Sequence, residues 1–191
     1  QDRGPSNQHR PQRLVTSYVW DIPGAPANGP VALRVLTRDW KLSGILTLQS
    51  GRPFSIAATG DPLAGIPGDR VNLIGSGNPV LDDDRSKGQK IQAYFDKNRF
   101  ANPAPNMIGT LGRNILEGPG FANFDVSLVK GFRMPFLGEA GLGQFRFEAF
   151  NAFNRTNFSN PNTGITNPSF GMLTGTDGGS RILQLALKFA F

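Results

Sequence analysis

The residue types that carry most enzymatic and metal chemistry are scarce in this sequence. It contains no cysteine, and its single histidine, His9, lies in a polar stretch near the first residue. These residues therefore offer no cysteine nucleophile, no cysteine-based zinc site and no disulfide, and a Ser-His-Asp triad would depend on His9 alone. No nucleophile, histidine and carboxylate form a recognisable set. We predict that the chain is not an enzyme and uses no cofactor.

Aspartates form the densest group of potential metal ligands. Asp82, Asp83 and Asp84 are consecutive, and Asp61 and Asp69 precede them in the sequence. Clustered carboxylates suit hard cations such as Ca²⁺, but consecutive side chains cannot all turn towards one ion, and the spacing is not that of an EF-hand loop. We interpret the run as a solvated acidic loop and predict no metal site. The basic residues that follow make it a mixed-charge loop that could contact lipopolysaccharide or a solute; they are Arg85, Lys87 and Lys90.

The overall charge raises nucleic-acid binding as another class of function. The 191 residues include 20 Lys and Arg against 14 Asp and Glu, which gives a formal net charge of +6. Nucleic-acid-binding domains usually gather their basic residues on one face, together with stacking aromatic residues. Here the basic residues are scattered along the sequence, so we predict no nucleic-acid partner.

Five segments with alternating apolar and polar residues predict β-strands. They span residues 13–22, 40–49, 124–132, 145–153 and 182–191. Gly, Pro and Asn interrupt nearly every window of helical length, which argues against helices. Only one residue on the apolar faces of these segments is charged, Lys130, whereas six charged residues lie on the opposite faces. We predict an all-β, antiparallel fold.

The lengths of the segments and of their connections favour a membrane barrel. The segments have nine or ten residues, which matches the roughly 9 to 11 residues that cross a bilayer at a tilt and exceeds the roughly five or six of a typical soluble strand. The connections 23–39 and 133–144 are short, and the connections 50–123 and 154–181 are long. Antiparallel order brings both long connections to one end, as in outer-membrane barrels with long extracellular loops and short periplasmic turns.

The connection 50–123 must have structure of its own, because structureless loops beyond about 15 residues are uncommon in compact proteins. Its apolar residues Tyr94, Phe95 and Phe100, together with the segment 71–74, could provide a small core. We therefore predict an ordered extracellular loop.

Aromatic residues near the ends of the predicted strands indicate a girdle at the periplasmic membrane surface. The girdle residues are Tyr18, Trp20, Trp40, Phe132 and Phe145. Lys130 is close enough to this rim for its ammonium group to leave the apolar region. The opposite faces of the strands would line the lumen or meet a plug, and their charged candidates are Asp125, Arg146, Glu148 and Lys188.

The charged residues of the last two segments could pair across the strands. In plausible antiparallel registers Arg146 and Glu148 lie across from Ala186 and Lys188, so that a Glu148–Lys188 pair is possible. Such an ion pair would contribute up to about 1 kcal/mol. We favour a structural or plug-facing network over a role in solute binding.

The last residues, RILQLALKFAF at 181–191, end in an aromatic residue with an apolar residue at every second position before it. This pattern resembles the terminal strand of bacterial outer-membrane proteins, whose final Phe is recognised by the barrel-assembly machinery. The resemblance implies an assembly signal formed by Leu183, Leu185, Leu187, Phe189 and Phe191.

Longer blocks extend the resemblance to most of the chain. They are SYVWDIPG (17–24), WKLSGILTLQSGRPFS (40–55), FDKNRFANPAP (95–105), GTLGRNILEGPGFANFDVSLVKGF (109–132) and QFRFEAFNAFNRTNFSNPN (144–162). These blocks are similar to the C-terminal barrel segment of TonB-dependent outer-membrane receptors, above all to the Oar-like branch. The resemblance implies a barrel of about 22 strands around a plug, which imports a bulky solute with energy relayed by TonB.

Five strands cannot close a barrel, for which about eight are needed, and open sheet edges cannot face lipid. We therefore expect residues 1–191 to be the C-terminal part of a larger receptor in the outer membrane of a Gram-negative bacterium. Its expected partners are outer-membrane lipid and lipopolysaccharide, the barrel-assembly machinery, the remaining strands and plug, TonB and an unknown solute. The alternative is a soluble, secreted β-sandwich for binding or adhesion, in which the apolar faces would pack together.

Overall fold

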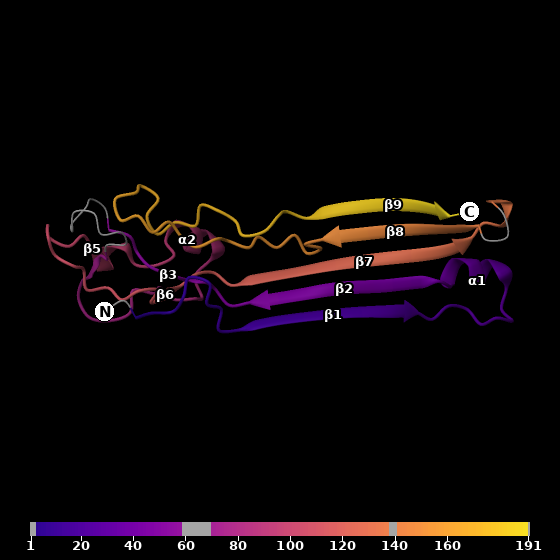
Figure 1. The fold of residues 1–191 in the computed structure, drawn as a ribbon, viewed down its shortest axis with the longest axis horizontal. Coiled ribbons are helices and arrows are strands. Elements are labelled where there is room, and N and C mark those ends of the chain that lie inside the picture. The colour runs from indigo at the N-terminus through magenta and orange to yellow at the C-terminus, as the bar shows by residue number, and fades with distance from the viewer. Residues whose placement is uncertain (1–2, 59–69, 138–140, 191) are drawn as a thin grey trace. The chain divides into compact units, whose positions relative to one another are not determined.

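The computed structural model describes residues 3–58, 70–137 and 141–190. The chain divides into two compact units (Figure 1). The sheet unit comprises residues 13–48, 122–156 and 179–191, and the loop unit comprises residues 1–12, 49–121 and 157–178. Each unit is therefore built from three separate stretches of sequence.

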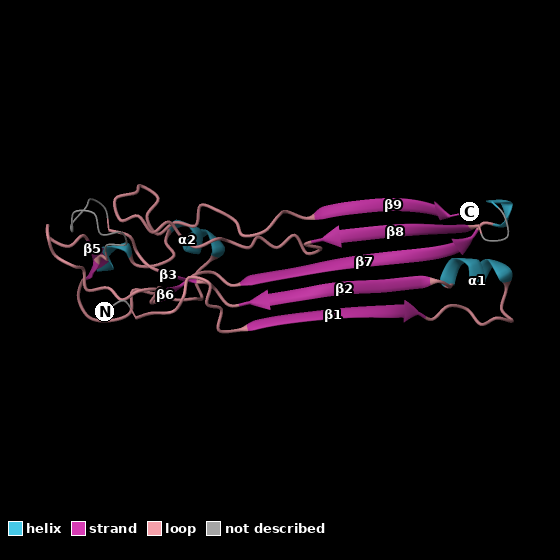
Figure 2. Cartoon of the chain, viewed as in Figure 1, coloured by secondary structure: helices cyan, strands magenta, loops and turns pink. Residues whose placement is uncertain are grey.

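The sheet unit contains a five-stranded sheet in the order β1-β2-β7-β8-β9, in which the strand directions alternate (Figure 2). Its strands are β1 (Arg13–Ile22), β2 (Trp40–Gln49), β7 (Phe121–Arg133), β8 (Leu142–Phe150) and β9 (Ile182–Ala190). The predicted all-β, antiparallel fold is confirmed, and β1 and β2 have the predicted bounds.

Two of the predicted strands have wrong boundaries. β8 starts at Leu142 rather than at 145, and it ends at Phe150 rather than at 153. It ends there because Asn151 and Asn154 adopt positive φ angles of 49° and 50°, which Asn tolerates but which a strand cannot contain. β7 starts at Phe121 rather than at 124, and it ends at Arg133 rather than at 132. The predicted fifth strand is confirmed up to Ala190, and Phe191 lies outside the described residues.

The register keeps the predicted apolar residues on one face. Leu128 of β7 pairs with Phe147 of β8, which in turn pairs with Leu185 of β9. We call this side the apolar face; across these three strands it comprises Val126, Leu128, Lys130, Phe132, Gly143, Phe145, Phe147, Ala149, Leu183, Leu185, Leu187 and Phe189. The other side is the polar face, with Ser127, Val129, Gly131, Arg133, Leu142, Gln144, Arg146, Glu148, Phe150, Ile182, Gln184, Ala186, Lys188 and Ala190.

Aromatic rings over glycines show that β1 and β2 continue the apolar face. A Cβ atom built on Gly44 would lie 2.9 Å from Cε1 of Tyr18, so the tyrosine ring occupies the space above this glycine. The same ring stacks on Phe124 of β7, with 6.5 Å between the ring centroids and 17° between the planes. Phe132 covers Gly143 of β8 in the same way. Both glycines let a large ring from a neighbouring strand lie flat on the sheet.

Short and long connections leave opposite ends of the sheet. Helix α1 (Val31–Thr37) lies between β1 and β2, and the 3₁₀ helix η2 (Pro135–Leu137) lies between β7 and β8. Because the strands alternate in direction, both of these connections belong to one end, the short-connection end. The β2–β7 and β8–β9 connections belong to the long-connection end. The predicted alternation is therefore confirmed. In the described ranges, no helix has the length and apolar character needed to cross a membrane.

The loop unit has little regular structure and a hydrophobic core. β3 (Pro53–Phe54) pairs with β6 (Leu116–Glu117), and β4 (Asn72–Leu73) pairs with β5 (Phe100–Ala101), each pair antiparallel. Helix α2 (Lys87–Gln92) begins with a capping box between Ser86 and Gln89, and the 3₁₀ helix η1 (Lys97–Arg99) follows it.

Phe95 lies at the centre of the loop unit's hydrophobic core. It is 1% exposed, and its ring centroid lies 5.3 Å from that of Phe100 and 5.2 Å from that of Phe170. The remaining buried members are Phe54, Ile56, Val71, Leu111 and Leu116. Of the predicted core residues, Phe95, Phe100 and Val71 are buried, and Tyr94 and Leu73 pack against the core, whereas Ile74 is about half exposed.

Candidate functional site

A polar pocket in the loop unit is the first candidate for ligand contact. Its volume is about 530 Å³, and three stretches of chain far apart in the sequence line it. The lining residues are Asn7, Gln8, Arg52, Pro53, Phe54, Ser55, Ser159, Asn160, Pro161 and Thr163. Amide and hydroxyl groups predominate, so the pocket offers both donors and acceptors to a polar molecule.

Asn114 holds the N-terminal stretch beside this pocket. Its Nδ2 atom donates to the carbonyl oxygen of Pro5 at 2.7 Å and to Oδ1 of Asn7 at 2.6 Å. Ser55 donates from its hydroxyl to Oδ1 of Asn114 at 3.0 Å and accepts from the Asn114 backbone N–H at 2.8 Å. Asn114 is 5% exposed and has a positive φ of 52°. One buried amide thus joins two walls of the pocket.

Two guanidinium groups give this part of the loop unit a local positive charge. Nη2 of Arg52 lies 2.5 Å from Oδ2 of Asp177, and Nη2 of Arg10 lies 3.7 Å from the same oxygen. One carboxylate is therefore shared by two cations, which leaves a net positive charge. Because both arginines remain partly exposed, they can contribute to the attraction of a polar or anionic solute.

One carboxylate of the acidic run 82–84 has a basic partner, and a neighbouring arginine binds the backbone around the run. Lys90 lies 3.0 Å from Asp83, and the Arg85 guanidinium donates to the carbonyl oxygens of Asp82, Ala93 and Tyr94. Among the described residues, no three potential metal ligands of the His, Cys, Asp or Glu type form a group. Asp61 and Asp69 lie outside the described residues.

Tyr94 is the described residue whose acidity is most clearly changed. Its hydroxyl donates to the carbonyl oxygen of Glu117 at 3.2 Å. Burial raises the pKa of Tyr94 to about 12, the negative charges of Asp83 and Glu117 act in the same direction, and Arg85 opposes them. The phenol therefore stays neutral and serves as a hydrogen-bond donor that fixes the loop unit.

The polar face of the sheet carries the predicted charges in a different pairing. Glu148 lies opposite Gln184, and Lys188 lies opposite Gln144, so the predicted Glu148–Lys188 pair is wrong. The reason is the antiparallel register: with Arg146 opposite Ala186, the residue two positions later on β8 meets the residue two positions earlier on β9, which is Gln184. Arg146 does lie opposite Ala186 as predicted, and its Nη1 is 3.7 Å from Oε1 of Glu148 on the same strand.

Asp125, predicted to face the lumen or a plug, has a structural partner at the end of β8. Its Oδ1 atom accepts from the backbone N–H of Asn151 at 2.8 Å and from Nδ2 of Asn123 at 2.9 Å. The side chain of Asn151 in turn donates to the carbonyl oxygens of Arg155 and Gly179, each at 3.0 Å. Asp125 thus anchors the turn after β8.

A second pocket, of about 410 Å³, lies at the short-connection end of the sheet. Two cationic residues of the polar face, Arg133 and Lys188, line it together with Gln144 and Asp39. The remaining lining residues are Gly131, Phe132, Leu142, Gly143 and Ala190. This pocket brings Lys188 together with Arg133, which was not among the predicted site residues.

Residues 1–184 match the protein family described as "outer membrane beta barrel domain". The chain belongs to this family. It is an outer-membrane β-barrel protein of a Gram-negative bacterium, as the alternating strands and their connections predict. Searches of the curated proteins and of the solved structures find no match.

The barrel family explains why the apolar face is uncovered. Leu183, Leu185 and Leu187 are 58%, 68% and 63% exposed. In a β-sandwich these residues would be buried under a second sheet, but the other sheets in the described part of the chain have strands of only two residues. The alternative of a soluble sandwich is therefore wrong.

The aromatic residues predicted as a girdle divide into two groups. Trp40 begins β2 and Phe132 lies near the end of β7, at the short-connection end, where the Lys130 ammonium lies 5.7 Å from the Trp40 ring. Trp20, near the end of β1, and Phe145, which pairs with Lys130, belong with the group at the short-connection end. Tyr18 instead belongs to a row with Phe124, and the ring of Phe153, which follows β8, stacks on Phe124 at 5.4 Å. This row lies towards the long-connection end of the sheet.

Lys130 reaches the rim of the sheet as predicted. Its ammonium group donates to the carbonyl oxygen of Arg38, in the connection just before β2. The side chain thus carries its charge along the apolar face to the backbone at the short-connection end, which is how long cationic side chains leave an apolar region.

Proposed function

We propose that this chain forms the C-terminal wall of a TonB-dependent receptor of the Oar-like kind, which imports a bulky solute across the outer membrane. The observation that supports the proposal is the folded loop unit, with a core of its own and a polar pocket of about 530 Å³, built from the long connections of a barrel sheet. A barrel wall needs only tight turns between its strands. Long connections that fold around a pocket favour solute capture over a purely structural role.

The two edges of the sheet require partners in the membrane. β1 and β9 are the outermost strands of the sheet, and each leaves one row of backbone groups unpaired within it. Unpaired backbone groups cannot face hydrocarbon, so we propose that further strands of the same receptor pair with both edges and close the barrel. On this proposal the apolar face meets outer-membrane lipid, and the loop unit faces lipopolysaccharide and solute.

The polar face is proposed to meet the plug. Arg146 and Glu148 form an ion pair on β8, and Lys188 lies with Arg133 beside the pocket of about 410 Å³. These groups fit a charged network with a plug domain inside the barrel, while TonB would deliver energy through the plug. Assembly would depend on recognition of β9 by the barrel-assembly machinery, through the alternating residues Leu183, Leu185, Leu187, Phe189 and Phe191.

The proposal predicts energy-dependent uptake. Cells with the intact gene, with the gene deleted, and with the gene intact but TonB removed would be grown in the same complex medium, and solutes lost from the medium would be compared by mass spectrometry. We expect at least one large solute to be depleted only when both the gene and TonB are present. Equal depletion with and without TonB would contradict the receptor proposal and favour a passive pore.

The pocket in the loop unit can be tested within the same assay. We expect Arg52→Ala together with Asn160→Ala to reduce the uptake of that solute while the protein remains in the outer membrane. The control is the pair Lys97→Ala and Asn98→Ala on η1, a cation and an amide that do not line the pocket. If both pairs reduce uptake equally, the pocket is not the capture site.

A further inference from the structure

Helix α1, in the connection between β1 and β2, turns its apolar side chains outward. Val31, Val35 and Leu36 are 65%, 60% and 68% exposed, and Leu33 is 48% exposed. At 3.6 residues per turn these residues and Ala32 share one broad side of the helix. A water-facing surface helix normally shows the opposite arrangement, so this side needs an apolar environment.

The polar side of α1 is turned inward. Nη1 of Arg34 donates to the carbonyl oxygen of Ala27 at 2.9 Å, and the hydroxyl of Thr37 accepts from the backbone N–H of Ala25 at 2.9 Å. Just after the helix, Nε of Arg38 donates to the carbonyl oxygen of Ala25 at 2.7 Å. The segment 25–27 therefore occupies the polar side of the helix, and only the apolar side is free to meet a partner.

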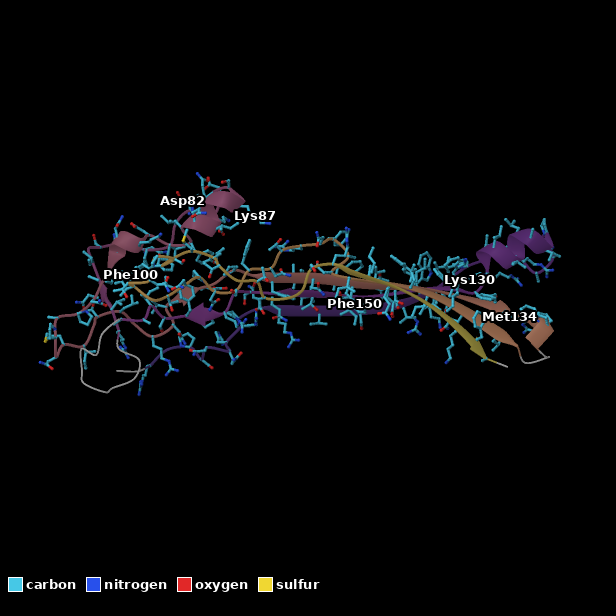
Figure 3. All side chains as sticks on the ribbon, turned by 90° about the horizontal axis from the view of Figure 1, so that it is seen from above. Asp82, Lys87, Phe100, Lys130, Met134 and Phe150 are labelled. Carbon is cyan, nitrogen blue, oxygen red and sulfur yellow. The ribbon has the colours of Figure 1, made fainter. Side chains whose placement is uncertain are left out.

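The end of α1 is hydrogen-bonded to side chains of the apolar face, which is proposed to meet lipid. Nε1 of Trp40 donates to the carbonyl oxygen of Leu36 at 2.8 Å, and the ammonium of Lys130 donates to the carbonyl oxygen of Arg38. Trp40 and Lys130 are in contact on the apolar face. Figure 3 shows Lys130 on the part of the sheet next to α1. The apolar side of the helix is therefore continuous with the surface that meets lipid.

We propose that α1 is an interfacial membrane helix, which lies in the leaflet at the short-connection end of the barrel with Val31, Val35 and Leu36 among the acyl chains. A Trp and a Lys at its base are the residue types that mark the boundary between hydrocarbon and headgroups. If the long connections face the cell exterior, this is the periplasmic leaflet. The helix extends the lipid-facing band of the barrel beyond the ends of β1 and β2 and resists vertical movement of this wall.

Collision measurements with nitroxide labels test the proposal. The sequence contains no cysteine, so one introduced thiol reports on one position once any cysteine elsewhere in the full-length protein is replaced by serine. Labels at Leu36→Cys and Val31→Cys would be compared in vesicles of phosphatidylethanolamine and phosphatidylglycerol. Leu185→Cys provides the lipid control, and Asn28→Cys, in the exposed connection before α1, provides the water control.

We expect the labels at positions 36 and 31 to collide with oxygen several-fold more often than with a water-soluble nickel complex, as the label at position 185 does. The oxygen-to-nickel ratio should be lower than at position 185, because the helix lies at the edge of the hydrocarbon. A ratio equal to that of the Asn28→Cys label would overturn the proposal in favour of a water-exposed helix. Protection from both reagents would overturn it in favour of a covering protein. The two positions give independent readings if one variant fails to assemble.

Discussion

Asp125 on β7 accepts a hydrogen bond from the backbone N–H of Asn151, 2.8 Å away, at the residue that directly follows β8. This bond satisfies a backbone donor where the strand ladder stops and the chain turns with a positive φ. The carboxylate therefore stabilises the turn that ends β8. Since the end of β8 sets the start of the long β8–β9 connection, Asp125 links the barrel wall to the segment that leads into the loop unit.

Replacing Asp125 by Ala should destabilise the sheet unit. The change removes the acceptor of two hydrogen bonds and leaves the Asn151 N–H unsatisfied, at an expected cost of about 1 to 3 kcal/mol. Urea unfolding of the full-length protein, followed by the heat-dependent shift on a gel, would measure the loss. Asp125→Asn should retain part of the stability, because its side-chain oxygen still accepts. Ser127→Ala, two residues further along the same strand, is the matched control and should change little.

Arginine at position 185 should block membrane assembly. Leu185 lies in the middle of β9 on the apolar face, and a cation at mid-bilayer depth costs about 2 to 4 kcal/mol. The matched control is Gln184→Arg, which adds the same charge to the polar face opposite Glu148 and should be tolerated. The amount of each variant in the outer membrane is the measurement, and equal recovery of both would argue that the apolar face does not meet lipid.

The sequence was sufficient to predict the sheet unit because alternation has a fixed period. Leu128, Phe147 and Leu185 lie on one face in the observed register. They would still share that face if a strand shifted by two residues, because side chains alternate between the two faces. Register itself was harder to predict. The Glu148–Lys188 pair was wrong because alternation sets only the face of each residue, whereas the register that places Arg146 opposite Ala186 puts Gln184 opposite Glu148 and Gln144 opposite Lys188.

The loop unit could be predicted only in part. The aromatic residues of the connection 50–123 predicted the core around Phe95 and Phe100. No local sequence pattern indicated that Phe170, which belongs to the β8–β9 connection, packs in the same core. The sequence analysis also missed that Asn114 holds the N-terminal stretch beside the pocket. A buried amide that donates hydrogen bonds to Pro5 and Asn7 leaves no local pattern in the sequence. Such contacts join stretches about 100 residues apart, and neither periodicity nor turn propensity carries information over that distance.

Glycine at position 114 should loosen the pocket of the loop unit. Asn114 has a positive φ, so Asn114→Gly removes the side chain without introducing backbone strain. The lost bonds to Pro5, Asn7 and Ser55 should cost about 1 to 3 kcal/mol. Limited proteolysis of the full-length protein in intact cells would report the loosening. Asn106→Gly, at another Asn with a positive φ but an exposed side chain, should leave the cleavage rate unchanged.

High pH should destabilise the loop unit through Tyr94. The pKa of this phenol is raised from 10.0 to about 12 in the folded protein. Between these values the folded state holds a proton that the unfolded state has lost, so stability is fully present below pH 10 and falls as pH rises towards 12. Protease resistance of the loop unit across this range is the measurement. Tyr94→Phe should abolish this component of the pH dependence; an unchanged profile would mean that other groups cause it.

Deletion of Phe191 should impair assembly more than stability. The alternating residues of β9 up to Phe189 keep their places on the apolar face without it, so the folded barrel should lose little free energy. If Phe191 is recognised by the barrel-assembly machinery, its deletion should lower the amount of protein in the outer membrane of growing cells several-fold. The urea midpoint of protein refolded into lipid vesicles should remain close to that of the wild type. Phe191→Tyr, which keeps an aromatic ring, should restore much of the yield, and equal losses in cells and in vesicles would contradict a recognition role for this residue.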